Sequence, residues 1–117
     1  MNISIKATGH TLTDETRDLI DTKFVKLAKL AGEEAGLAFE IEESVAVVRA
    51  GARYRAEGNL TVDGRLYRAE ATGATLESAI DRARDELVRE VRQSKSRTRR
   101  LAKRGGAMIK RALRFGR

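Results

Sequence analysis

The chain has no cysteine, no proline and no tryptophan, and its only histidine is His10. Without cysteine it can form neither a disulfide nor a thiolate metal site, and it has no thiol nucleophile. It contains only three Phe and two Tyr. The core must therefore be aliphatic and built from Leu, Ile, Val and Ala.

The motifs that carry catalysis are also missing. There is no glycine-rich phosphate loop, no metal-ligand cluster and no Ser/His/Asp set with motif-like spacing. His10 has no nearby carboxylate or nucleophile pattern, which favours a loop residue over a catalyst. We therefore expect no enzymatic activity, no cofactor, no metal and no small-molecule substrate.

Long apolar runs are absent as well. The N-terminal residues lack a run of signal-peptide length, and no segment approaches the roughly 18 apolar residues of a membrane span. We therefore expect a cytoplasmic protein without a membrane partner.

Positive charge is concentrated near the C-terminal end. Residues 1–93 contain 14 Lys and Arg against 17 Asp and Glu, whereas residues 94–117 contain 10 Lys and Arg and no acidic residue. A chain of 117 residues can bury one core but not two. The sequence thus predicts one domain over residues 1–93 and a basic tail over residues 94–117. Such blocks of like charge are typical of interaction tails, whose commonest partner is nucleic acid.

A β-hairpin is predicted around Asp63 and Gly64. An Asp-Gly pair between two alternating runs is the strongest short-range hairpin signal, because a type I′ turn needs positive φ at both central residues. If Val62 pairs with Arg65, one face of the hairpin carries mostly small and apolar residues, against which a helix can lie closely. The other face is strongly charged, so it is either solvated or bound to a polar partner.

Two amphipathic helices are predicted. Thr13 is the expected N-cap of the first, which runs to about residue 31 and ends at Gly32. Thr75 is the expected N-cap of the second, with Glu77 in its first turn. Their buried residues recur every three or four positions. They are Thr16, Ile20, Phe24, Leu27 and Ala31 in the first helix and Leu76, Ala79, Ile80, Ala83, Leu87 and Val91 in the second.

The remaining segments are predicted as strands, over residues 2–6, 39–48, 53–62 and 65–72. The element order is therefore β-α-β-β-β-α. Three strands with short links form an antiparallel meander, and the first strand joins them through the first helix. We predict an α+β fold with a four-stranded sheet, two antiparallel helices on one of its faces and the other face exposed.

The tail leaves several interpretations open. Residues 94–104 either extend the second helix or stay disordered until they bind a partner. Beyond Gly105 and Gly106, residues 107–115 interleave apolar and basic side chains as a short amphipathic helix does. That segment could dock on the domain, lie on an anionic membrane or fold against RNA.

Two runs of residues resemble the ribosome hibernation promoting factors, also called ribosome-associated inhibitors. They are NLTVDGRLYRAEATG over residues 59–73 and AIDRARDELVR over residues 79–89, and the first-helix pattern from Leu12 to Lys29 matches as well. The resemblance spans residues 2–97. It implies the same β-α-β-β-β-α fold, which is similar to a double-stranded RNA-binding domain. The chain resembles a short form of the family.

The resemblance also implies a function. Members of that family bind the small ribosomal subunit in the channel that tRNA and mRNA normally occupy, and so block translation in stressed or resting bacteria. The implied partners are the small subunit or the 70S ribosome, and their 16S rRNA. The alternative is a regulatory module that uses its basic tail and exposed sheet to bind an acidic protein or a membrane.

The resemblance implies that basic residues along the two helices contact rRNA. A charge run on a helix is ordinarily a solvated surface, so it is the resemblance that favours RNA contact here. A domain that lies on folded rRNA needs spaced cations on rigid helices to reach phosphates and follow groove shape. The implied contacts are Arg17, Lys23, Lys26, Lys29, Arg82, Arg89, Arg92 and Lys95, with further tail contacts expected from Arg97, Arg99, Arg100, Lys103 and Arg104.

Overall fold

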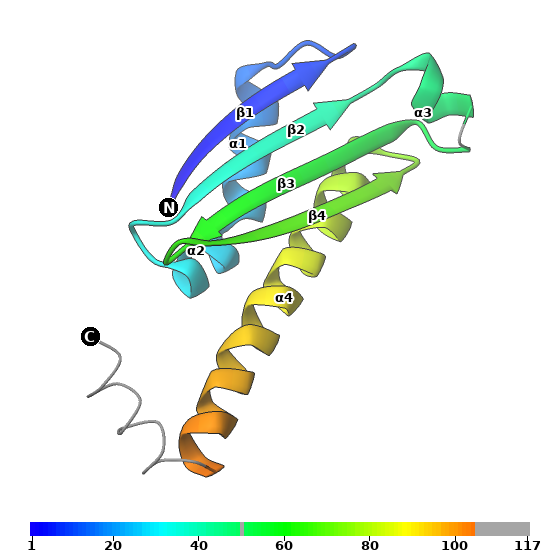
Figure 1. Cartoon of the computed structure of the whole chain (residues 1–117). Coiled ribbons are helices and arrows are strands. Elements are labelled where there is room, and N and C mark those ends of the chain that lie inside the picture. The colour runs from blue at the N-terminus through cyan, green and yellow to red at the C-terminus, as the bar shows by residue number, and fades with distance from the viewer. Residues whose placement is uncertain (50, 105–117) are drawn as a thin grey trace.

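A four-stranded sheet with helices on one face makes up the computed structural model, which describes residues 1–49 and 51–104 (Figure 1). The predicted α+β fold is confirmed, and the segment predicted at residues 107–115 lies outside the described residues. The elements in chain order are β1 (Asn2–Thr8), α1 (Asp14–Lys23), α2 (Val25–Ala31), β2 (Gly36–Glu42), α3 (Val45–Arg49), β3 (Tyr54–Val62), β4 (Arg65–Gly73) and α4 (Leu76–Arg104).

The strands lie across the sheet in sequence order. β1 and β2 are parallel, whereas β2 with β3 and β3 with β4 are antiparallel. The hairpin has the predicted register, because Val62 pairs with Arg65. Asp63 and Gly64 have φ values of 50° and 76°, as a type I′ turn requires.

The first predicted helix begins at its expected cap and ends at its expected glycine. The hydroxyl of Thr13 accepts a hydrogen bond from the backbone N–H of Thr16 at 3.1 Å. A bend at Phe24, where ψ is 8°, divides the helix into α1 and α2. Gly32 then ends α2 with a φ of 96°, a value that glycine adopts without steric cost.

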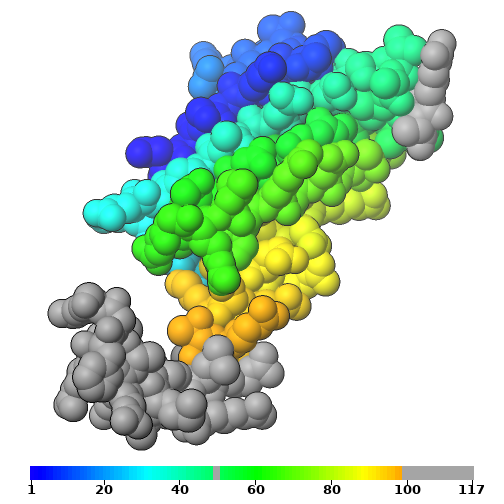
Figure 2. Space-filling model, viewed as in Figure 1, coloured from blue at the N-terminus to red at the C-terminus, as the bar shows by residue number. Residues whose placement is uncertain are grey.

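α4 is the longest element of the protein. The hydroxyl of Thr75 caps it by accepting a hydrogen bond from the backbone N–H of Ser78 at 3.1 Å. The helix passes Gln93 without a break and reaches Arg104, so the first part of the predicted tail extends the helix. Its 29 residues correspond to about 44 Å, and Figure 2 shows its C-terminal part projecting beyond the sheet. No helix in the described ranges is apolar over a length that would cross a bilayer.

The core lies between the sheet and the helices. Two of the three phenylalanines join the aliphatic side chains in it, with Phe24 of α2's cap and Phe39 of β2 in edge-to-face contact at a centroid distance of 4.9 Å. Gly58 lets α4 approach β3 closely, because a Cβ there would lie 2.8 Å from Cδ1 of Leu87. The largest fully buried side chains are Phe24, Phe39, Ile20, Leu27, Leu37, Ile41, Leu60, Ile80, Leu87 and Val91.

The strand predicted over residues 39–48 is wrong at both ends, since β2 spans Gly36–Glu42. Glu42 pairs with Thr8, which is the last residue of β1, so a longer β2 would have no residue of β1 to pair with. The hydroxyl of Ser44 instead accepts a hydrogen bond from the backbone N–H of Val47 at 3.3 Å and starts α3. The alternation of Val45 and Val47 suggested one face of a strand. In the structure both residues belong to the short helix α3, in which Val47 is buried.

The two helical segments are parallel, and the antiparallel arrangement that we expected is wrong. One parallel and two antiparallel pairings make β1 and β4 point the same way. Each is followed by a helix that returns along the sheet, so both helices begin at one end of the sheet and finish at the other (Figure 1). The contacts agree with this direction: Lys23 meets Glu77 near the start of α4, and Leu30 meets Lys95 farther along it.

Candidate nucleic-acid interface

Parallel packing gives the helical layer one end with acidic first turns and another end where the C-terminal part of α4 is basic, although Glu33 and Glu34 follow α2 there. The first turns of both helices carry acidic residues, Asp14 and Glu15 in α1 and Glu77 in α4. The C-terminal parts carry lysines and arginines, and residues 92–104 of α4 contain no Asp or Glu. Each end matches the helix dipoles, which favour negative charge at N-termini and positive charge at C-termini. A polyanion would therefore approach the C-terminal end of the layer.

Lys23 lies between α1 and α4 and is held by two carboxylates. Its Nζ is 2.7 Å from Oε1 of Glu77 and 3.0 Å from Oδ1 of Asp81, and its side chain is only 20% exposed. The hydrogen bond to Glu77, followed by the one to Asp81, raises the pKa of Lys23. The same Asp81 oxygen also lies 3.2 Å from Nη1 of Arg84. Lys23, which was predicted to contact RNA, thus forms salt bridges that link α1 to α4.

A second lysine joins the basic ends of α2 and α4. The Nζ of Lys95 donates a hydrogen bond to the backbone carbonyl of Leu30 at 2.6 Å, in the last turn of α2. The exposed Lys26 and Lys29 lie within one turn of Leu30, and the exposed Arg92 lies within one turn of Lys95. We call Lys26, Lys29, Arg92 and Lys95 the basic end. The structure therefore places four of the eight predicted helix contacts near the joined ends of α2 and α4, where Lys29 also lines a hollow with Asp21 and Glu33.

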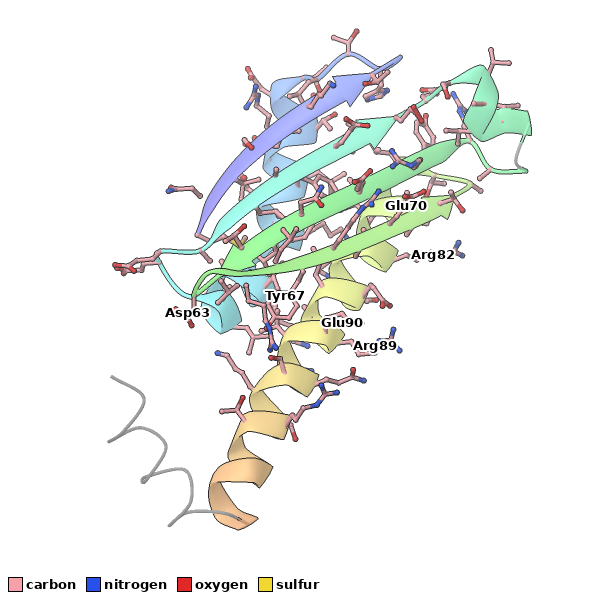
Figure 3. The ribbon with its side chains drawn as sticks, in the orientation of Figure 1. Asp63, Tyr67, Glu70, Arg82, Arg89 and Glu90 are labelled. Carbon is pink, nitrogen blue, oxygen red and sulfur yellow. The ribbon has the colours of Figure 1, made fainter. Side chains whose placement is uncertain are left out.

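Other predicted contacts lie away from the basic end. Nη1 of Arg82 donates to the carbonyl of Thr72 at 2.8 Å. Nη2 of Arg89 donates to both carboxylate oxygens of Glu86 at 2.6 and 2.7 Å, and this contact raises the pKa of Arg89. Figure 3 shows Arg82 and Arg89 pointing to the same side of α4. Arg17 is exposed on α1, before Lys23.

In the tail, Arg97 is exposed on α4, two residues beyond Lys95 of the basic end. The side chains of Arg99, Arg100, Lys103 and Arg104 lie outside the described side chains, although their backbone belongs to α4. Their place on the same helix continues the basic end along the axis.

The outer face of the sheet is charged but balanced. Arg55 contacts Glu40 at 3.4 Å, Glu70 at 3.0 Å and Glu57. Arg68 lies 3.0 Å from Glu57, and these pairings offset the repulsion between Glu57 and Glu70, which face each other across the hairpin. Because cations and carboxylates neutralise each other there, the face offers a polyanion little attraction.

A groove that no sequence pattern predicted lies between the hairpin tip and α4. Its volume is about 620 Å³, and its lining includes Val62, Asp63, Arg65, Tyr67, Ser94 and Lys95. The hairpin register could have indicated this groove. When Val62 pairs with Arg65, the side chains of Arg65 and Tyr67 lie on the face of β4 that is covered by α4. Among the described residues, no cluster of three or more metal-ligating side chains is found.

The fold and this surface define a small α+β domain whose helical layer has one basic end. Comparison with known proteins then identifies the family. Residues 3–99 match the family described as sigma 54 modulation protein / S30EA ribosomal protein, and the chain belongs to it. This is the family of the hibernation promoting factors and protein Y, so the resemblance found in the sequence is confirmed. Its members are ribosome-associated regulatory proteins rather than enzymes.

Solved structures that are similar to this chain include two examples. The N-terminal domain of Protein Y from Thermus thermophilus has 31% sequence identity and a TM-score of 0.67, and the match covers 80% of this chain and 98% of that one. A ribosomal subunit interface protein from Coxiella burnetii has the same fold, with 14% identity, a TM-score of 0.66, and coverage of 82% and 99%. The search of curated protein sequences returned no match.

Proposed function

We propose that this protein is a cytoplasmic translation inhibitor that binds the small ribosomal subunit in the tRNA and mRNA channel. The observation that carries the proposal is the basic end, which a member of a ribosome-associated family presents at one end of its helical layer. Lys26 and Lys29 from α2 and Arg92 and Lys95 from α4 contact phosphates of 16S rRNA. Binding blocks initiation and keeps idle ribosomes from translating under stress.

The physical basis is charge held at fixed spacing on rigid helices. Phosphate contacts set the position and affinity of a protein on RNA, and each one that forms releases counterions. The described residues offer few aromatic platforms, so recognition depends on the shape and charge of folded rRNA more than on base sequence. Arg97 and the basic residues that follow it in α4 extend the contact along the helix axis.

The predicted contacts differ in how readily they can meet RNA. Lys23 would have to leave Glu77 and Asp81, and Arg89 would have to leave Glu86. We therefore propose that the basic end makes the main contacts, that Arg17, Arg82 and Arg89 contact phosphates elsewhere on the helical layer, and that Lys23 acts mainly by holding α1 against α4.

Sedimentation through sucrose gradients tests the proposal. The full chain should travel with 30S or 70S particles at low salt and be released at high salt. The double variant Lys26→Gln, Lys29→Gln should weaken association by about tenfold or more, since two phosphate contacts are lost. The matched control is Lys6→Gln, Arg68→Gln, which removes the same charge from the outer face of the sheet.

Three results would contradict the proposal. The wild-type chain could migrate freely at low salt, both double variants could lose association equally, or the chain could bind acidic proteins or anionic vesicles in preference to ribosomes. Binding in the tRNA and mRNA channel can be tested separately, by competition with initiator tRNA. Inhibition of translation in vitro should decrease as initiator tRNA is added, and inhibition that is indifferent to this tRNA would exclude the channel.

A further inference from the structure

The groove between the hairpin tip and α4 combines apolar walls with fixed cations. Val62 is buried and Tyr67 is half-buried against the core, so the floor is apolar and includes one aromatic ring. Arg65 and Lys95 supply positive charge, and Asp63 supplies an acceptor at the turn. Figure 3 shows Asp63 at the tip of the hairpin and Tyr67 between β4 and α4.

The two cations are held by contacts that leave donors available. Nη1 of Arg65 donates to the hydroxyl of Ser94 at 2.5 Å, which ties the guanidinium of β4 to α4. Within the described residues, the other N–H groups of Arg65 have no hydrogen-bond partner. The ammonium group of Lys95 donates one of its three hydrogens to the carbonyl of Leu30, so two hydrogens remain available as donors. Both groups can therefore donate to an anion without giving up their present contacts.

We infer that this groove binds one unpaired nucleotide of single-stranded RNA. The base stacks on the ring of Tyr67, the phosphate lies between Arg65 and Lys95, and the Asp63 carboxylate accepts a hydrogen bond from the base or from the ribose 2′-hydroxyl. Single-stranded RNA is commonly bound in this way, by a cationic groove that follows the backbone and a ring on which a base stacks. The volume of about 620 Å³ is within the usual range for ligand sites.

Charge argues against the chain's own tail as the occupant. Residues 105–117 contain four Lys and Arg and no acidic residue, so Arg65 and Lys95 would repel them. An RNA strand has the opposite charge. It would also reach the groove directly from the basic end, because Lys95 belongs to both. The inference rests on the proposed function, to which it adds a site for one extruded base beside the phosphate contacts.

The test uses the full chain and a single-stranded oligoribonucleotide of about six nucleotides with one internal 2-aminopurine. Stacking on Tyr67 should quench the fluorescence of this base. Tyr67→Leu should lose the quenching and weaken binding by about tenfold, whereas Tyr67→Phe, which keeps the ring, should retain both. Thermal unfolding shows whether Tyr67→Leu has remained folded.

The role of Arg65 is tested with a matched control on the same strand, Arg68. Arg65→Gln should weaken oligonucleotide binding by about five- to tenfold, whereas Arg68→Gln, whose side chain is on the opposite face of β4, should have no effect. The inference is overturned if Tyr67→Leu and Arg65→Gln bind as the wild type does. It is also overturned if a duplex of the same length or polyphosphate competes as well as the single strand.

Ribosome sedimentation separates this inference from the function on which it rests. If the wild type travels with ribosomal particles but shows no quenching, the groove site is refuted and the proposed function stands. If the oligonucleotide is quenched but no ribosome association is seen, the proposed function is refuted and the groove remains an RNA site.

Discussion

The ammonium group of Lys23 lies 2.7 Å from a carboxylate oxygen of Glu77, across the contact between α1 and α4. The two residues are 54 positions apart in the chain, so the pair ties the first helix to the last. A residue that the family resemblance implied as an RNA contact is thereby placed as a structural link.

Lys23 and Lys26 should therefore respond differently to the same substitution. We expect Lys23→Gln to lower the melting temperature and to leave the salt dependence of ribosome binding unchanged. Lys26→Gln should keep the melting temperature and reduce the slope of log affinity against log salt by about one. Thermal unfolding and sedimentation at several salt concentrations measure the two effects. Equal slopes for the two variants would show that Lys23 also contacts RNA.

Arg55 should control how stability depends on pH. It contacts Glu40, Glu57 and Glu70 with a side chain that is 19% exposed, so Arg55→Met removes the cation that these three carboxylates share and leaves them only the more exposed Lys6 and Arg68. We expect a loss of about 1–3 kcal/mol in the free energy of unfolding at pH 7, the range for removing one partner of a charged hydrogen bond.

That loss should shrink as the pH falls below 4.5. The hydrogen bond from Arg55 lowers the pKa of Glu70 below its usual 4.5. A carboxyl with a lowered pKa in the folded state contributes stability above its unfolded pKa, and the contribution disappears as the pH falls through the folded pKa. Urea unfolding of wild type and Arg55→Met between pH 3 and pH 7 tests this. A gap that is constant over the range would contradict it.

Two buried glycines should differ in how much an added methyl group destabilises the fold. At Gly58 a new Cβ meets Cδ1 of Leu87 at 2.8 Å, the far end of a side chain that can shift. At Gly73 it meets the backbone nitrogen of Ala79 at 2.7 Å, and the start of α4 cannot shift as easily. We expect Gly58→Ala to cost about 1 kcal/mol and Gly73→Ala about 3 kcal/mol. Chemical denaturation checks the ranking, which equal losses would contradict.

Local chemistry made much of the fold predictable. The turn at Asp63 and Gly64 sets the hairpin register because few residue pairs tolerate positive φ twice in succession. Thr13 and Thr75 mark helix starts because a side-chain oxygen can satisfy a free backbone N–H only there. The valines near residue 45 were misassigned because alternation over a few residues does not distinguish a strand from one helical turn.

The candidate site was predictable only as a set of cations. The sequence predicted that Lys23, Lys26 and Lys29 lie on one helix. The local sequence does not show which of these lysines pairs with a carboxylate of another element. That depends on α4, whose Glu77 and Asp81 reach Lys23 and whose Lys95 reaches the end of α2.

The sequence alone determined the hairpin, the two helix starts, the apolar stripes and the unbalanced charge near the C-terminus, since each depends on residues that are close in the chain. The tertiary structure decided that the helices are parallel, that Lys23 is paired while Lys26 is exposed, and that Arg65 and Tyr67 line a groove with Lys95. These features join residues far apart in the chain, and they follow from the way β1 and β4 point, which only the pairing of the whole sheet sets.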